Sequence, residues 1–106
     1  MTGIELIAEE RQRQIDVEGY TAQHDSNHKV SEFIYAAIAY AESAKVSANS
    51  EGLGLSDLEI GRRKAEMGRF FPWGADSFKP TTCRRDLIKA GALIAAAIDR
   101  LNQNEQ

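Results

Sequence analysis

Two long alanine-rich segments constrain the fold more than any other feature of this sequence. Segments 30–48 and 83–103 are runs of apolar and small residues with no strand-like alternation. The apolar side chains of 30–48 wrap most of a helix circumference, which predicts burial on more than one side. The pattern therefore predicts a fold built around two apolar helices.

Two further segments are predicted to be helical. Segment 4–18 consists of good helix formers with apolar residues at helical spacing, and Gly19 after it is typical of a helix end. Segment 57–67 predicts a short helix, which Gly61 weakens. Thr82 or Thr81 can cap the helix at 83–103. The remaining segments are predicted to be loops: 20–29, 49–57 and the aromatic-rich 68–82.

The chain length of 106 residues indicates a single domain, 1–106, with a thin core. We predict an all-α fold with three principal helices and a short variable one. Helices 30–48 and 83–103 have more apolar surface than one neighbour can cover, so we expect a homo-oligomeric bundle held by their alanine-rich faces. The alternative is that helix 57–67 covers the spare face.

Charge and hydropathy exclude some classes of protein. The 13 Lys and Arg residues are outnumbered by 16 Asp and Glu, which makes a globally basic nucleic-acid binder an unfavourable hypothesis. No apolar stretch approaches the roughly 20 residues that span a bilayer, and the first residues are charged where a signal peptide would be apolar. The single cysteine, Cys83, fits a reducing compartment. We therefore expect a protein of the host-cell cytoplasm with no membrane partner.

Arg11 is the first candidate for a binding role. It lies within the apolar arc of helix 4–18, and Glu18 lies on the same side. A guanidinium in such a position needs an anion, which is either a carboxylate of the same chain or a ligand phosphate.

Acids and histidines form a second group of candidates. His24, Asp25 and His28 could hold a divalent metal or position a base, or the polar loop could simply cap the next helix. Glu32 and Asp86 could together bind Mg²⁺ or Mn²⁺, or each could stabilise the first turn of its own helix. We expect Arg11, Glu32 and Asp86 to converge in one polar pocket, because isolated buried charges are costly.

Aromatic and basic residues surround the start of helix 83–103. Phe71 and Trp73 offer stacking surfaces, while Lys79, Arg84 and Arg85 bring positive charge to a helix N-terminus that already favours anions. This combination suits a ligand with a base and a phosphate. The alternative is that the rings cover the end of the thin core and the arginines pair with acids of the same chain.

The chain resembles a family of small phage and prophage proteins. The resemblance rests on ERQRQI at 10–15, EGY at 18–20, His24-Asp25 with His28, Glu32, FPW at 71–73, FKP at 78–80 and RRDLIKAGALI at 84–94. It implies a phage-type protein, for which a defence signalling nucleotide is one candidate ligand and counter-defence one candidate role.

A weaker likeness links the chain to MazG-like nucleotide pyrophosphohydrolases, which are all-α, oligomeric and magnesium-dependent. Helix 83–103, with Asp86 and Ala90, is similar to their last catalytic helix. Those enzymes carry a Glu-Glu-x-x-Glu pattern on another helix, whereas here Glu32 is followed by four residues without a carboxylate. Most of the metal-binding carboxylates of that family are therefore missing.

Three functions follow as hypotheses. The first is a protein that binds or sequesters a phosphorylated nucleotide. The second is an enzyme, a metal-dependent nucleoside triphosphate pyrophosphohydrolase with Glu32 and Asp86 as metal ligands. The third is a protein-binding inhibitor that uses the aromatic loop. No catalytic residue is assigned, and the expected ligand-binding residues are Arg11, Glu18, His24, Asp25, His28, Phe71, Trp73, Lys79, Arg84 and Arg85.

Overall fold

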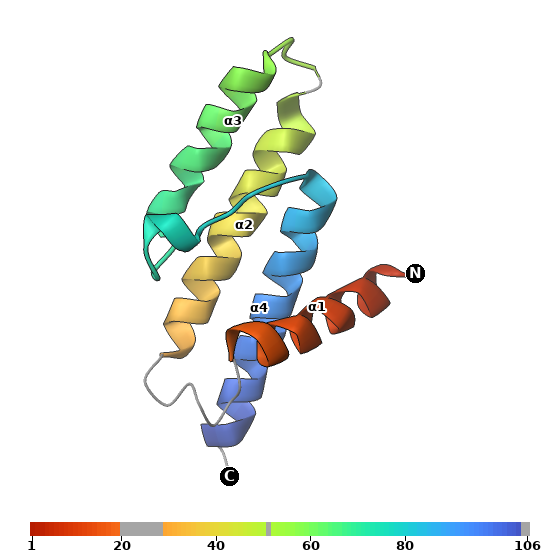
Figure 1. The fold of residues 1–106 in the computed structure, drawn as a ribbon, viewed down its shortest axis with the longest axis vertical. Helices are drawn as coiled ribbons and strands as arrows, with labels where there is room; N and C mark the ends of the chain where they lie inside the picture. Colours follow the sequence, from red (N-terminus) through yellow and green to blue (C-terminus); the bar gives the residue numbers. More distant parts are fainter. Residues whose placement is uncertain (20–28, 51, 105–106) are drawn as a thin grey trace.

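The computed structural model describes residues 1–19, 29–50 and 52–104 of the chain. Within these ranges all regular structure is helical, which confirms the prediction of an all-α fold (Figure 1). The four α-helices are α1 (Gly3–Glu18), α2 (Val30–Ser50), α3 (Asp57–Glu66) and α4 (Cys83–Asn104). Two 3₁₀ turns, η2 (Met67–Phe70) and η3 (Ala75–Ser77), lie in the segment between α3 and α4.

None of the helices in the described ranges has the length and hydropathy needed to cross a membrane.

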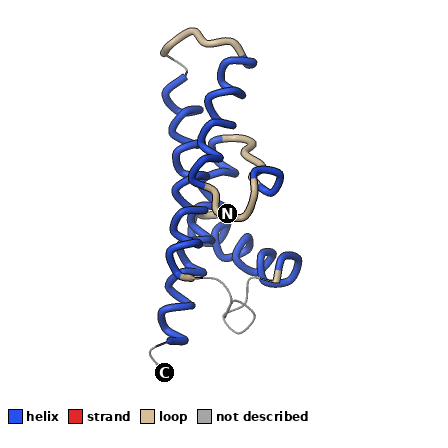
Figure 2. The backbone as a smooth tube through the Cα atoms, turned by 90° about the vertical axis from the view of Figure 1, so that its left-hand side faces the viewer, coloured by secondary structure: helices blue, strands red, loops and turns tan. Residues whose placement is uncertain are grey.

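The centre of the fold is the pair α2 and α4, which run antiparallel side by side (Figures 1 and 2). Small side chains face each other between them, and this lets the two helices approach closely. The large side chains of the buried cluster are Phe33 and Tyr40 of α2, Leu93 of α4 and Phe78 of the segment before α4. The buried alanines of the cluster are Ala36, Ala37, Ala39, Ala90, Ala96 and Ala97.

This packing corrects one expectation. The alanine-rich faces of 30–48 and 83–103 were expected to hold an oligomer together, but most of their alanines are buried inside the single chain. Ala37, for example, is only 4% exposed. The small residues therefore serve the contact between α2 and α4, and any contact between copies would need a different surface.

Helix α1 has well-defined ends and crosses over α4 (Figure 1). The Thr2 hydroxyl accepts a hydrogen bond from the N–H of Glu5, whose carboxylate accepts one from Thr2 in return. Gly19 ends the helix with a φ of 72°, a left-handed conformation that favours glycine. At the crossing, a Cβ added to Gly91 would lie 2.6 Å from the Ile7 Cδ1 atom. The absence of a side chain at Gly91 therefore permits the close contact with α1.

Helix α3 packs against α2 and is tied to α4 by a buried ion pair. The Lys64 Nζ atom lies 3.0 Å from Asp86 Oδ2, and both side chains are almost completely buried. Lys64 also donates to the Ser47 hydroxyl and to the carbonyl of Thr81. Asp86 accepts from the Ser43 hydroxyl and from the N–H of Thr81. These bonds join α2, α3 and the start of α4.

The aromatic segment after α3 lies along α2. Phe71, Trp73 and Phe78 form a chain of edge-on and tilted ring contacts with Phe33 and Tyr40, with centroid separations of 4.9–5.9 Å. The rings thus cover part of the core, as one of the sequence alternatives proposed. Phe71 and Trp73 are nevertheless only partly buried.

Candidate functional site

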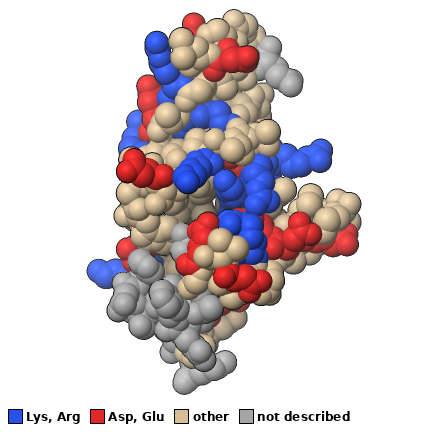
Figure 3. All heavy atoms as spheres, viewed as in Figure 1, with Lys and Arg blue, Asp and Glu red and all other residues tan. Residues whose placement is uncertain are grey.

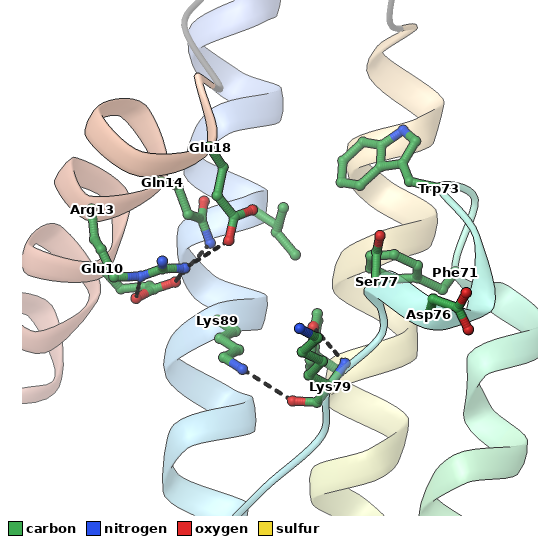
Figure 4. Close-up of a pocket in the computed structure, with 12 residues that line it drawn as sticks. Glu10, Arg13, Gln14, Glu18, Phe71, Trp73, Asp76, Ser77, Lys79 and Lys89 are labelled. Carbon is green, nitrogen blue, oxygen red and sulfur yellow. Dashed lines mark hydrogen bonds and ion pairs between the residues drawn. The ribbon is translucent and has the colours of Figure 1, made fainter.

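A cleft opens between α1, α4 and the aromatic segment, with α2 beneath it, and has a volume of about 250 Å³ (Figure 4). Figure 3 shows Lys and Arg side chains gathered near the middle of this face, beside Asp and Glu. One wall is polar and comes from α1, and the opposite wall is largely aromatic. The lining residues are Glu10, Arg13, Gln14, Glu18, Tyr40, Phe71, Trp73, Asp76, Ser77, Lys79, Lys89 and Leu93.

The polar wall is a network of side chains one helical turn apart on α1. Arg13 donates to Glu10 through Nε at 2.7 Å and Nη2 at 2.9 Å, and to Glu18 at 3.1 Å. Gln14 donates its amide N–H to Glu10 Oε2 at 3.2 Å. Arg85 of α4 also pairs with Glu10. Three side chains, Arg13, Gln14 and Arg85, are therefore held by the one buried carboxylate of Glu10.

The charge of Glu10 is stabilised by its cations. Burial alone would raise the pKa of the Glu10 carboxyl, but the hydrogen bond from Arg13 and the charges of Arg85 and Arg13 outweigh it and hold the pKa below its ordinary value of 4.5. The same hydrogen bond raises the pKa of the Arg13 guanidinium. Glu10 and Arg13 are therefore ionised at neutral pH.

A pH dependence of stability follows from Glu10. Its lowered pKa contributes stability that is present above pH 4.5 and is lost as the pH falls through the folded-state pKa. We expect Glu10→Gln to lower the free energy of unfolding at pH 7 by about 1–3 kcal/mol and to flatten its decline between pH 5 and pH 3. Urea unfolding across this range measures both effects. Glu9→Gln, at an exposed neighbour, is the control; equal pH profiles for the wild type and Glu10→Gln would contradict the assignment.

Gln14 has unused hydrogen-bonding capacity. Its side chain is only 3% exposed, and its amide nitrogen faces the acceptor Glu10. This orientation fixes the position of the amide oxygen, because only the nitrogen can donate to a carboxylate. The Gln14 Oε1 atom is buried and accepts no hydrogen bond from the described part of the chain. The Gln14 Oε1 atom can therefore accept a hydrogen bond from a donor outside the described part of the chain.

The base of the cleft combines a ring with a lysine. Lys89 lies over Tyr40, with its Nζ atom 5.1 Å from the ring centroid, and donates to the carbonyl of Lys79 at 3.0 Å. The Tyr40 hydroxyl accepts a hydrogen bond from the N–H of Lys79 at 3.2 Å. Burial raises the pKa of the Tyr40 hydroxyl, so this group stays neutral.

Lys89 is the most distinctive charge of the cleft. Burial lowers the pKa of its ammonium group, and the nearby Arg85 lowers it further. Among the residues that the structure describes, no carboxylate forms an ion pair with Lys89 or with Lys79. A half-buried ammonium without a carboxylate is poorly solvated, and an anion in the cleft would relieve this.

Four of the expected ligand-binding residues line the cleft. They are Glu18, Phe71, Trp73 and Lys79. Glu18 stands at the C-terminal end of α1, and Phe71 and Trp73 stand opposite it on the aromatic segment (Figure 4). The structure thus brings together aromatic and charged candidates that are more than 50 residues apart in the sequence.

The three expected arginines have other positions. Arg11 pairs with Asp99 of α4 at 3.1 Å, and its side chain is only 11% exposed. Arg85 pairs with Glu10 and so follows the internal alternative. Arg84 lines an apolar groove of about 630 Å³ between the start of α1 and α4. None of the three lines the cleft, although Arg85 reaches the cleft residue Glu10 from behind the polar wall.

The expected convergence of Arg11, Glu32 and Asp86 is wrong. Glu32 is in the first turn of α2, where its carboxylate accepts the N–H of Lys29 at 2.5 Å. Asp86 contacts Ser43, which lies 11 residues further along α2 and therefore about 16 Å away. Glu32 and Asp86 are too far apart to share a metal ion, and Asp86 is already paired with Lys64.

His24, Asp25 and His28 lie outside the described residues. Within the described ranges no three His, Cys, Asp or Glu side chains are grouped closely enough to hold a metal ion. The residues proposed as a magnesium or manganese site, Glu32 and Asp86, do not fit that role.

Sequence reasoning missed several residues of the cleft. Lys89 is a lysine within the apolar run of α4, and this was a signal that it needs a partner. Glu10, Arg13 and Gln14 are spaced three and four residues apart, as expected for neighbours on a helix surface. Tyr40 had no distinguishing signal, because its hydroxyl is used only once the aromatic segment folds back onto α2.

The chain was compared with known proteins in three ways. No protein-family model, no curated protein and no solved structure matches it.

Proposed function

We propose that the protein binds a small phosphorylated nucleotide in the cleft between α1, α4 and the aromatic segment. The observation that carries the proposal is Lys89, a half-buried ammonium without a carboxylate partner in the described chain, beside a wall of aromatic rings. Lys89 and Lys79 would contact the phosphate. Phe71 and Trp73 would flank the base.

The polar wall suits the rest of a nucleotide. Glu18 can accept hydrogen bonds from ribose hydroxyls, and the buried Gln14 Oε1 atom can accept one from a hydroxyl or an exocyclic amine. Arg13 and Arg85 stay paired with Glu10 and keep this wall rigid. Pockets for drug-sized ligands measure about 300–1,000 Å³. A cleft of about 250 Å³ therefore favours a mononucleotide over a larger nucleotide.

Sequestration is favoured over hydrolysis. A magnesium-dependent pyrophosphohydrolase needs several carboxylates around its metal ions. Here Asp86 is bonded to Lys64, and Glu32 caps α2. The aromatic rings are partly buried and face the cleft, so they favour a small ligand over the hypothesis of an inhibitor that docks through the aromatic loop.

A thermal-stability panel tests the proposal. We expect nucleoside mono-, di- or triphosphates to raise the melting temperature, with a stabilisation of about 2.7 kcal/mol at 100 times the dissociation constant. Nucleosides without phosphate should have a smaller effect, because they leave Lys89 unpaired. The panel is repeated with Mg²⁺ and Mn²⁺, and products are analysed by chromatography. We expect a raised melting temperature with the nucleotide left intact. Release of pyrophosphate would show that the protein is a hydrolase instead. If no nucleotide raised the melting temperature, the proposal would be rejected.

A further inference from the structure

One side of the α2 and α4 pair is bare. In Figure 2, α1 and the aromatic segment lie to the right of the pair, and no described element lies to its left. A solvent-facing side of a helix is usually polar, but both helices expose large apolar side chains. On α4, Leu87, Ile94, Ile98 and Leu101 are 46–53% exposed.

These side chains of α4 lie along one line of the helix surface at heptad spacing. We call such a line of side chains a seam. The contact with α2 uses Asp86, Ala90, Leu93 and Ala97, which are spaced by four, three and four residues. The exposed residues stand one position further along the chain, at 87, 94, 98 and 101. Gly91, between the first two, lies under Ile7 of α1, and Leu87 lines the groove beside the start of α1. Regular spacing of four and three residues is the pattern of a helix that packs along a partner helix. Helix α4 therefore has one seam that α2 occupies and a second that α1 covers only near Gly91.

Helix α2 repeats the arrangement in the same register. Its buried seam contains Phe33, Ala37, Tyr40 and Ala44, and the next positions are 34, 38, 41 and 45. Ile34 is 46% exposed and Ile38 is 37% exposed. One residue turns a helix by about 100°, and the two helices are antiparallel, so both exposed seams fall on the same side of the pair.

We infer that this face, formed by Ile34, Ile38, Leu87, Ile94, Ile98 and Leu101, is the interface of a homodimer. A helix with two adjacent heptad seams is typical of a four-helix bundle, in which each helix has two neighbours. The chain supplies two such helices with matching seams. A second copy related by a two-fold axis supplies the other two.

The absence of charge on this face favours a second copy as the occupant. The six residues of the face are uncharged, so two identical faces meet without repulsion. Lys45, at the end of the α2 seam, is paired with Glu42 of its own helix. The α4 seam spans about 21 Å, and two helices side by side are about 20 Å wide. Two such faces have a combined footprint of about 840 Å², the size of a weak or transient interface, for which we expect a dissociation constant of micromolar order.

Sedimentation equilibrium of the full chain tests the dimer. At about 100 μM, well above a micromolar dissociation constant, we expect the wild type to sediment as a dimer. Ile98→Glu should weaken association at least tenfold, because it places two carboxylates in an apolar interface. Because the Ile98 side chain is already half exposed in the single chain, the variant should keep the helical circular dichroism of the wild type.

Leu58→Glu is the matched control, since Leu58 is an exposed leucine of α3 outside the face. This variant should sediment as the wild type does. A monomeric wild type at 100 μM would overturn the inference, and the apolar face would then have to serve a different protein. Dimers of unchanged affinity in Ile98→Glu would overturn it as well.

Discussion

Asp86→Ala is expected to destabilise the folded chain by about 3–5 kcal/mol, the range for removing one partner of a buried ion pair. The substitution leaves the Lys64 ammonium buried without its carboxylate, since Lys64 is only 6% exposed. It also removes the acceptor of the Ser43 and Thr81 hydrogen bonds. A domain of this size has a total stability of about 5–15 kcal/mol, so the variant should be close to unfolding at 37 °C. Urea unfolding at 25 °C measures the loss.

A double-mutant cycle separates the ion pair from simple cavity formation. Asp86→Leu combined with Lys64→Met replaces both charges by apolar side chains, which is often neutral or stabilising for buried pairs. We expect the double variant to be more stable than either single variant. Two results would contradict the ion pair as the link between α3 and α4. One is a loss of less than about 1 kcal/mol in the free energy of unfolding of Asp86→Ala. The other is a double variant whose loss equals the sum of the losses of the two single variants.

Lys89→Met is expected to weaken the stabilising effect of nucleotides strongly without lowering the stability of the protein alone. Burial and Arg85 lower the pKa of the ammonium, so its charge opposes folding below the ordinary pKa of 10.5. Removing the charge should leave the melting temperature unchanged or raise it. A charge-assisted hydrogen bond contributes about 1.5–3 kcal/mol, so nucleotide affinity should fall roughly 10- to 100-fold. Calorimetric titration of both proteins gives the affinities.

Lys45→Met is the control for Lys89→Met, because Lys45 is an exposed lysine of α2 whose partner is Glu42. It should bind nucleotide as the wild type does. A Lys89→Met protein that is markedly less stable would give Lys89 a structural role, and one that binds with wild-type affinity would remove Lys89 from the proposed site.

The helices could be predicted from the sequence because their signals are local. The predicted segments 4–18, 30–48 and 83–103 lie within α1, α2 and α4, and Thr82 caps α4 as expected. The predicted segment 57–67 runs one residue past α3, because the chain turns into a 3₁₀ helix at Met67. Periodicity shows which face of a helix is apolar, but not which helix covers it. For this reason the prediction that the alanine-rich faces hold an oligomer together was wrong.

The candidate site was predictable only in part. Phe71, Trp73 and Lys79 stand out by their residue types, whereas the role of Asp86 depends on Lys64, 22 residues away in the sequence. The pairing of Arg11 with Asp99 likewise depends on the angle at which α1 crosses α4. Long-range pairing of charges therefore decides which residues are left for a ligand, and sequence spacing does not contain that information.

Trp73 offers the most direct test of nucleotide binding in the cleft. It is the single tryptophan of the chain, so its indole N–H gives one unique signal in a ¹H–¹⁵N NMR spectrum. Titration with a nucleoside monophosphate should shift this signal progressively to saturation, with the same dissociation constant as calorimetry, because Trp73 lines the cleft. An indole signal that stays in place while calorimetry reports binding would put the nucleotide elsewhere. No binding by any nucleotide in either measurement would contradict the central claim.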